Sequence, residues 1–158
     1  MIRVLFVCLG NICRSPMAEA IFRKRIEREG LSDKMTVDSA GIGHWHIGKE
    51  PHKGTRTLLD QNKISYKDMK ARQVEPADWD HFDYIIAMDE QNMSDLQAIR
   101  EKNGVEVDLF MNYVEEADLK GVPDPYFTGN FDYVYKLIDT GSTNLLEQIK
   151  QKHFKEEL

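Results

Sequence analysis

Four short runs of the chain are rich in β-branched and aromatic residues and are separated by longer segments of mixed polarity. The runs cover residues 2–8 (IRVLFVC), 35–39 (MTVDS), 82–88 (FDYIIAM) and 105–110 (VEVDLF). Short apolar runs rich in β-branched and aromatic residues are typical of strands buried on both faces of a parallel sheet. The pattern therefore predicts four strands over these ranges, of which the last has the weakest signal.

The segment after the first run has the spacing of a helix. Ser15 precedes Pro16, which is favoured in a first helical turn, so we predict that Ser15 caps this helix and that Gly30 ends it. One face of the predicted helix is apolar and carries Ala18, Ile21, Phe22 and Ile26.

Three further helices are predicted. One covers residues 54–62, and a second is capped by Asp89 and reaches about Lys102. Asn130 opens a long C-terminal helix, although Gly141 lies inside it and a glycine weakens a helix interior.

Strands that alternate with helices imply an α/β fold. We expect residues 1–158 to form a single domain, an open four-stranded parallel sheet with helices on both faces. No repeat, low-complexity tract or linker divides the chain. In such sheets ligands bind beyond the carboxyl ends of the strands. The loop between the first strand and the first helix is therefore the first place to look for a site.

That loop begins with a thiol and ends with a cation. Cys8 closes the first strand, and Arg14 follows six positions later at the start of the helix. A tight loop at a helix N-terminus turns several backbone N–H groups inward, which makes a pocket for a tetrahedral oxyanion. Gly10 and Asn11 tolerate the left-handed backbone that such a loop needs. The guanidinium of Arg14 can bind two anion oxygens, so we predict a phosphate-binding loop here.

The same positive field stabilises a thiolate. We expect Cys8 to be ionised at neutral pH, with Ser15 donating a hydrogen bond to the sulfur. A charged sulfur below a bound oxyanion is arranged for covalent catalysis. No metal and no cofactor is needed, because Arg14 and the amides supply the positive charge.

Other interpretations of Cys8 have less support in the sequence. A cysteine at a strand end is often only a buried apolar residue. The spacing of Cys8, Cys13, His44 and His46 does not match the usual zinc ligands, and the histidines are interpreted as surface residues. A dinucleotide site is disfavoured because no G-x-G-x-x-G follows the strand. The combination of strand end, glycine, arginine and Ser-Pro favours the anion-binding thiol.

Charge and composition narrow the class of protein further. The net charge is −6, which disfavours a nucleic-acid partner. No apolar stretch approaches the roughly 18 residues of a membrane helix, and the N-terminus lacks the pattern of a signal peptide. The two cysteines are five positions apart, so they cannot connect distant parts of a fold. We therefore expect a cytoplasmic protein with free thiols, without membrane insertion and without nucleic-acid binding.

Two motifs in this order resemble a known family. "VCLGNICRSPMAEA" together with "VPDPYF" is similar to the low-molecular-weight protein-tyrosine phosphatases, most closely to their Gram-positive bacterial branch. The resemblance covers the whole chain, through "DSAGIG", "KARQV" and "FDYIIAMDEQN".

The resemblance implies a role for each residue of the site. Cys8 is the nucleophile, Arg14 binds the phosphoryl oxygens, and Asp124 is the general acid and later the base. Asn11 holds the loop in shape and Ser15 supports the thiolate, while Ser39 and Asp89 are supporting residues. The phosphate is cradled by the loop residues Leu9, Gly10, Asn11, Ile12 and Cys13.

The expected substrate is a phosphotyrosine-containing protein. Tyr126 and Trp45 are interpreted as aromatic walls for the substrate ring. Related phosphoarginine phosphatases carry threonine at the position of Ile12 and Asp-Pro-Phe in place of "DPY", so they are the alternative within this fold. Thiol-dependent arsenate reductases need further cysteines beyond Cys13, and this chain has none. From another class, a redox-sensing or anion-sensing module without turnover stays open, with a Cys8–Cys13 disulfide under oxidation.

Two positions depart from the pattern of the family. Many relatives have a histidine before the "KARQ" segment, whereas this chain has Met69. Many also have a second tyrosine after Asp-Pro, where this chain has Phe127.

We expect the protein to be a monomer.

Overall fold

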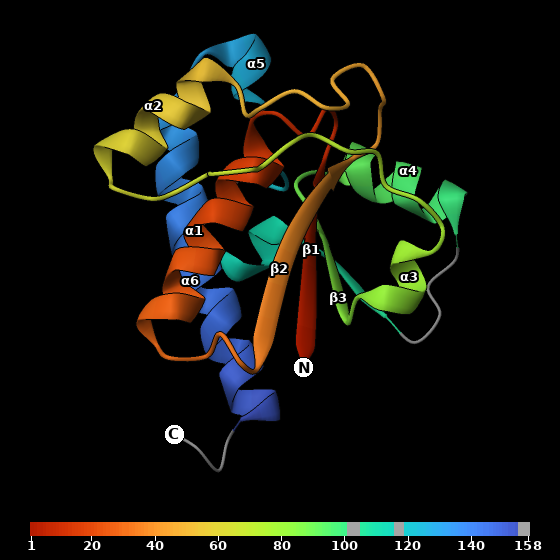
Figure 1. Cartoon of the computed structure of the whole chain (residues 1–158). Coiled ribbons are helices and arrows are strands. Elements are labelled where there is room, and N and C mark those ends of the chain that lie inside the picture. Colours follow the sequence, from red (N-terminus) through yellow and green to blue (C-terminus); the bar gives the residue numbers. More distant parts are fainter. Residues whose placement is uncertain (101–104, 116–118, 155–158) are drawn as a thin grey trace.

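The four strands form one parallel sheet in the order β2–β1–β3–β4 (Figure 1). The structure is a computed structural model and describes residues 1–100, 105–115 and 119–154. The strands are β1 (Ile2–Cys8), β2 (Met35–Gly41), β3 (Tyr84–Ala87) and β4 (Glu106–Leu109). The strand order reverses between β1 and β3, and a doubly wound sheet has its ligand crevice at such a switch point. Cys8, at the carboxyl end of β1, lies there.

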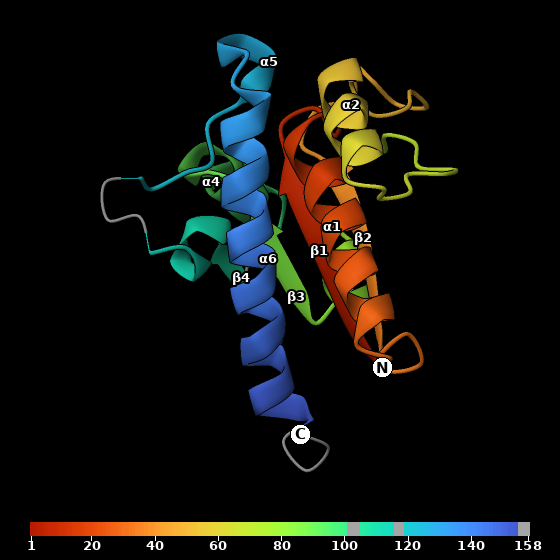
Figure 2. The same ribbon diagram turned by 90° about the vertical axis from the view of Figure 1, so that its left-hand side faces the viewer.

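Helices cover both faces of this sheet. The helices are α1 (Arg14–Arg28), α2 (Lys53–Gln61), α3 (Asp78–His81), α4 (Glu90–Ile99), α5 (Pro125–Thr128) and α6 (Phe131–His153), with a 3₁₀ turn η1 at Phe110–Tyr113. Helices α1, α2 and α6 lie on the left of the sheet in Figure 1, and α3 and α4 lie on its right; in Figure 2 the first group faces the viewer. The predicted α/β fold, with four parallel strands and helices on both faces, is confirmed.

The side chains of β1 alternate between two cores. Val4 and Phe6 pack with α1 and α6, while Leu5 and Val7 pack with α3 and α4. All four are fully buried. Burial on both faces is why the strand reads as a continuous apolar run, and the resulting rigid strand fixes the position of Cys8 at its end.

The observed boundaries differ from the predicted ones by a few residues. Strand β2 continues to Gly41 because Ala40 and Gly41 pair with the end of β1. Strands β3 and β4 are shorter than their apolar runs, and the chain enters η1 directly after Leu109. Helix α4 ends at Ile99, and the predicted end at Lys102 lies outside the described residues. Helices α3 and α5 have four residues each, too few to show a helical period.

The predicted cap of the first helix is wrong. Helix α1 begins at Arg14 with Cys13 in the cap position, so Ser15 lies inside the first turn. The Ser15 hydroxyl lies 3.0 Å from the sulfur of Cys8 and accepts a hydrogen bond from Asn11 Nδ2 at 2.8 Å. The side chain is therefore part of the thiol loop and does not cap the helix.

Helix α6 continues without a break through Gly141, in contrast to the expected weakening. A Cβ atom at this position would lie 2.3 Å from Cε1 of Phe110. The glycine allows η1 to pack closely on the helix, so its role is close approach and not interruption. No helix in the described ranges combines the length and the apolar character needed to cross a membrane.

Candidate active site

The sulfur of Cys8 has polar contacts with the thiol loop and with the first turn of α1. Cys8 is 3% exposed, and its Sγ accepts a hydrogen bond from the backbone N–H of Asn11 at 3.3 Å. The Ser15 hydroxyl lies 3.0 Å from the same sulfur. Asn11 has a φ of 58°, so Asn11, and not Gly10, adopts the left-handed backbone expected in this loop. The predicted contact between Ser15 and the sulfur is present.

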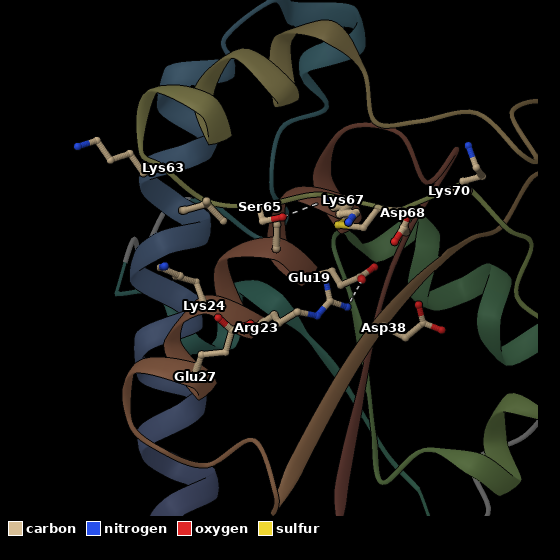
Figure 3. Close-up of a pocket in the computed structure, with 13 residues that line it drawn as sticks. Glu19, Arg23, Lys24, Glu27, Asp38, Lys63, Ser65, Lys67, Asp68 and Lys70 are labelled. Atoms are coloured by element: carbon tan, nitrogen blue, oxygen red, sulfur yellow. Dashed lines mark hydrogen bonds and ion pairs between the residues drawn. The ribbon is translucent and has the colours of Figure 1, made fainter.

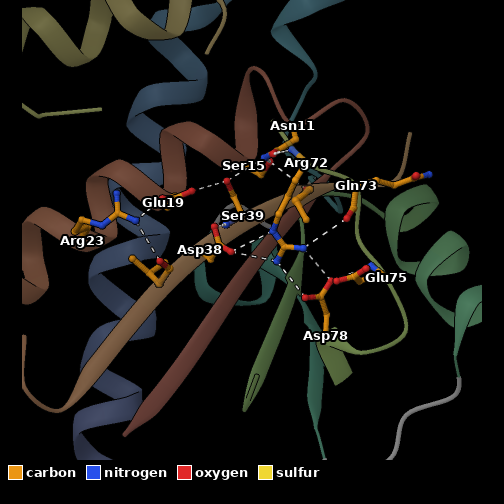
Figure 4. Close-up of polar contacts among 12 residues, drawn as sticks. Asn11, Ser15, Glu19, Arg23, Asp38, Ser39, Arg72, Gln73, Glu75 and Asp78 are labelled. Atoms are coloured by element: carbon orange, nitrogen blue, oxygen red, sulfur yellow. Dashed lines mark hydrogen bonds and ion pairs between the residues drawn. The ribbon is translucent and has the colours of Figure 1, made fainter. Parts of the chain in front are cut away.

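The side chain of Asn11 ties the loop to its surroundings (Figure 4). Its Nδ2 donates to Ser15 Oγ at 2.8 Å and to Ser39 Oγ at 2.9 Å, and its Oδ1 accepts from the backbone N–H of Arg72 at 2.9 Å. Three segments of the chain therefore meet on one buried amide. This geometry agrees with the expected bracing by Asn11 and Ser39.

The guanidinium of Arg14 lies between two carboxylates and is 2% exposed. Nη1 donates to Asp89 Oδ2 at 2.6 Å and to the carbonyl of Val122 at 3.0 Å, while Nη2 lies 3.3 Å from Asp124 Oδ2. Burial lowers the pKa of Arg14, but the neighbouring negative charges outweigh burial and raise the pKa. Nε is buried and has no hydrogen-bond partner among the described residues. The Nε and Nη2 edge is the side of the group that binds an oxyanion in two-point fashion.

Asp89 has two roles at once. Its Oδ1 accepts from the backbone N–H of Asn92 at 2.8 Å, which caps α4, and its Oδ2 binds Arg14. The sequence predicts Asp89 as a helix cap, and the family resemblance implies that it supports the site; both contacts are present.

Asp124 approaches the thiol loop from the far end of the chain. Its Oδ1 accepts from the backbone N–H of Tyr126 at 3.1 Å and caps the short helix α5. Its side chain is 21% exposed and lies on the wall of the same pocket as Cys8. An acid, a guanidinium and a sulfur are thus brought together from positions 8, 14 and 124.

A pocket of about 360 Å³ opens over the sulfur. Cys8 and Asp124 line it together with four further loop residues, both predicted aromatic walls, His46 and Phe127. The full lining is Cys8, Leu9, Gly10, Ile12, Cys13, Trp45, His46, Asp124, Tyr126 and Phe127. Trp45 is 60% exposed and Tyr126 is 52% exposed, so both stand at the mouth. Asn11 and Ser15 do not line the pocket, and their buried side chains lie behind the backbone of the loop. A mainly apolar wall with a polar floor suits an aromatic group that carries an anion.

The two histidines near this mouth could not be predicted from the sequence. The lack of a usable spacing predicts a surface position for His46, yet it lines the pocket and its ring centroid lies 6.2 Å from that of Tyr126. His52 caps α2 through Nδ1, which accepts from the backbone N–H of Gly54 at 3.0 Å. Their positions in a loop without periodicity carried no signal, apart from the neighbouring Trp45. Over the described ranges no group of three or more metal-binding side chains converges, so the zinc set with Cys8 and Cys13 is not brought together.

Cys13 differs chemically from Cys8. Burial raises the pKa of the Cys13 thiol to about 12, and the charge of Cys8 acts in the same direction. Below that pH Cys13 carries its proton, and a protonated thiol is a poor nucleophile. We therefore expect iodoacetamide at neutral pH to add one group per chain, at Cys8, as seen by peptide mass spectrometry. The Cys13→Ser variant is expected to react like the parent and Cys8→Ser to stay unmodified, whereas first addition at Cys13 would contradict this assignment.

An open parallel sheet that presents a thiol in an anion-binding loop, facing an arginine and an acid, defines the class of thiol-dependent phosphatases. The family model described as low molecular weight phosphotyrosine protein phosphatase matches residues 3–155. The chain belongs to this family.

Individual relatives agree with this assignment. The protein is 54% identical to the low molecular weight protein-tyrosine-phosphatase YfkJ of Bacillus subtilis, over 96% of this chain and 98% of YfkJ. The crystal structure of YfkJ superposes with a TM-score of 0.94 over 97% of each chain. PtpA of Staphylococcus epidermidis, also named a low molecular weight protein-tyrosine-phosphatase, is 43% identical over 99% of each chain. The crystal structure of a Drosophila arginine phosphatase superposes with a TM-score of 0.86 at 33% identity, over 93% of this chain and 97% of that chain.

The resemblance to the Gram-positive branch is thereby confirmed, and the protein is a protein-tyrosine phosphatase that acts on phosphoproteins. The interpretation as a sensor without turnover is set aside.

Proposed function

We propose that this phosphatase hydrolyses phosphotyrosine through a cysteinyl-phosphate, with Cys8 as nucleophile, Arg14 as the phosphoryl ligand and Asp124 as the proton donor. The observation that carries the proposal is the convergence of the three groups. Cys8 and Asp124 line one pocket, and the guanidinium of Arg14 lies 3.3 Å from Asp124.

In the first step the Cys8 thiolate attacks phosphorus while the bond from phosphorus to the phenolic oxygen breaks. Asp124 gives its proton to the leaving oxygen, so that tyrosine departs neutral. In the second step Asp124, now a carboxylate, takes a proton from a water that attacks the phosphocysteine. Inorganic phosphate leaves and the thiolate is restored, so atoms and charges balance over the cycle.

The contact between Arg14 and Asp124 supports this order of events. A phosphoryl group bound on the Nε and Nη2 edge of Arg14 competes with Asp124 for Nη2. Asp124 is then released from Arg14 and is free to turn toward the leaving oxygen. Binding of the substrate itself thus prepares the acid for the first step.

The lining of the pocket favours phosphotyrosine. Trp45 and Tyr126 stand at its mouth, where a phenyl ring on the way to the sulfur would pack between or beside them. Ile12 presents an apolar surface inside the pocket and offers no hydroxyl to a guanidinium. The similarity to an arginine phosphatase keeps phosphoarginine as the second candidate.

A comparison of two peptides tests the choice of substrate. Phosphate release is measured from matched phosphotyrosine and phosphoarginine peptides with EDTA present. We expect kcat/KM to favour phosphotyrosine roughly 100-fold, within the range that an apolar pocket can discriminate. The variant Ile12→Thr should lower the ratio of kcat/KM for the phosphotyrosine peptide to kcat/KM for the phosphoarginine peptide. Equal or reversed preference would reject phosphotyrosine specificity, and loss of activity in EDTA would reject the metal-independent mechanism.

We further infer a single-domain, monomeric enzyme of the cytoplasm. The family model spans residues 3–155 without a break, which supports one domain. Both cysteines are free thiols, as expected in a reducing compartment.

A further inference from the structure

A partly buried ion pair lies behind the thiol loop, outside the pocket. Glu19 of α1 is 5% exposed, and its carboxylate pairs with the guanidinium of Arg23 one turn later. Its other oxygen, Oε1, accepts a hydrogen bond from Ser39 Oγ at 2.6 Å. Figure 4 shows Glu19 between Arg23 on one side and Ser39 on the other. Neither Glu19 nor Arg23 has a role in the mechanism above.

We propose that Arg23 is a positioning residue for the reaction, because its ion pair holds the Glu19 carboxylate against Ser39, where the carboxylate strengthens a hydrogen-bond chain that ends on the sulfur of Cys8. The proposal rests on the proposed function only in that Cys8 is the nucleophile.

The direction of the chain follows from which atoms can donate. A carboxylate only accepts, so the hydroxyl of Ser39 must give its hydrogen to Glu19. The lone pairs of Ser39 Oγ are then left to accept from Asn11 Nδ2 at 2.9 Å. Ser39 is thus fixed as donor on one side and acceptor on the other.

The amide of Asn11 connects Ser39 to Ser15. Its Oδ1 accepts from the backbone N–H of Arg72, so Nδ2 must face the two serines. Because Nδ2 donates to Ser15 Oγ at 2.8 Å, the hydrogen of Ser15 is left for another acceptor. The choice lies between Cys8 Sγ at 3.0 Å and the carbonyl of Ala40 at 3.4 Å. The shorter contact directs the hydroxyl hydrogen of Ser15 toward the sulfur, and this hydrogen bond stabilises a thiolate.

Arg23 is the cation that the described residues place against Glu19. Burial raises the pKa of Glu19 above its ordinary value, and the charge of Arg23 and the hydrogen bonds from Ser39 and Arg23 offset only part of that rise. Without Arg23 the carboxyl would tend to take up a proton and become a weaker acceptor. Met69 stands where many relatives have a histidine and, as a thioether, cannot supply the missing charge. Arg23 Nη2 also donates to the carbonyl of Val37 at 3.2 Å, which holds the guanidinium against β2.

The ion pair lies at the wall of a second and larger cavity, of about 560 Å³ (Figure 3). The side chain of Arg23 is 39% exposed there, whereas that of Glu19 is 7% exposed. Lys24 lines the same cavity from the next position of α1. Arg23 can therefore be replaced without opening the core, and Lys24 provides a matched control.

The test combines turnover with direct alkylation of Cys8. We expect Arg23→Met to lower kcat/KM on a phosphotyrosine peptide about tenfold, with most of the loss in kcat, in line with the weakening of one hydrogen bond. The rate of Cys8 alkylation by iodoacetate, which reports the thiolate without any turnover, should fall in parallel. Arg23→Lys should restore most of both, and Lys24→Met should change neither. Urea midpoints check that each variant is folded.

A double-mutant cycle separates positioning from general destabilisation. If Arg23 acts through Glu19, adding Arg23→Met to Glu19→Gln costs little beyond Glu19→Gln alone. Additive losses, unchanged alkylation in Arg23→Met, or an equal loss in Lys24→Met would overturn the proposal. If Arg23→Met does not fold, Arg23→Gln takes its place in the cycle. The proposed function fails separately, if Cys8→Ser retains activity, whatever the result at Arg23.

Discussion

Replacement of Cys8 by serine is expected to lower the turnover of a phosphotyrosine peptide by a factor on the order of 10⁴ or more. The reason lies in the contacts of the sulfur. Its neighbours are the N–H of Asn11 and the hydroxyl of Ser15, and neither of them is a base. The nucleophile must therefore be ionised before the substrate arrives. A thiol can meet this requirement near neutral pH, whereas a serine hydroxyl cannot.

Phosphate release under saturating substrate measures the loss. The matched control is Cys13→Ser, which changes the other buried thiol of the loop and should keep most of the activity. Rapid acid quenching of the parent enzyme should trap phosphorus on the peptide that contains Cys8. Activity of Cys8→Ser within tenfold of the parent, or phosphate trapped on a different residue, would contradict the covalent mechanism.

Replacement of Asp124 by alanine is the second large effect, a loss of roughly 100-fold or more in kcat on phosphotyrosine with KM changed little. Without the acid, the phenolate must leave without a proton. The loss should shrink for aryl phosphates with acidic phenols, because a good leaving group needs no proton. A series of such substrates therefore measures the contribution of proton transfer itself.

Two further variants separate chemistry from structure at this position. Asp124→Asn can still accept from the N–H of Tyr126 and so preserves the cap of α5, yet it has no proton to give at neutral pH. It should be as slow as Asp124→Ala. Asp132→Ala removes an exposed acid from the start of the following helix and should leave the rate unchanged. A loss that is the same for every leaving group would argue against Asp124 as the acid.

Features that depend on a few adjacent residues could be predicted from the sequence. The strand that ends at Cys8, the left-handed residue in the loop and the arginine at the helix start all lie within seven positions of one another. Their geometry is local, so residue type and spacing were sufficient. Asp124 is different, because an Asp-Pro in a loop is usually a turn, and only the resemblance to a family pointed to it.

Features that depend on the meeting of distant segments could not be predicted. In the sequence, Glu19 has only the pattern of a helical residue. Its contact with Ser39 depends on the parallel register, which pairs Phe6 with Ser39 and places Ser39 beside α1. The hydrogen bond from Asn11 Nδ2 to Ser39 Oγ, between positions 28 residues apart, depends on the same register. The sequence carries the residue types, while the register decides which of them meet.

The ion pairs that Arg14 makes with two carboxylates join segments that lie far apart in the sequence. The partners of this guanidinium stand 75 and 110 positions further along the sequence. During synthesis on the ribosome the thiol loop is therefore made well before Asp89 and Asp124, and Arg14 gains its two carboxylate partners only when both segments have been made and have folded back against it. A fragment cut before position 124 is expected to keep the loop sequence but to lack the proposed proton donor.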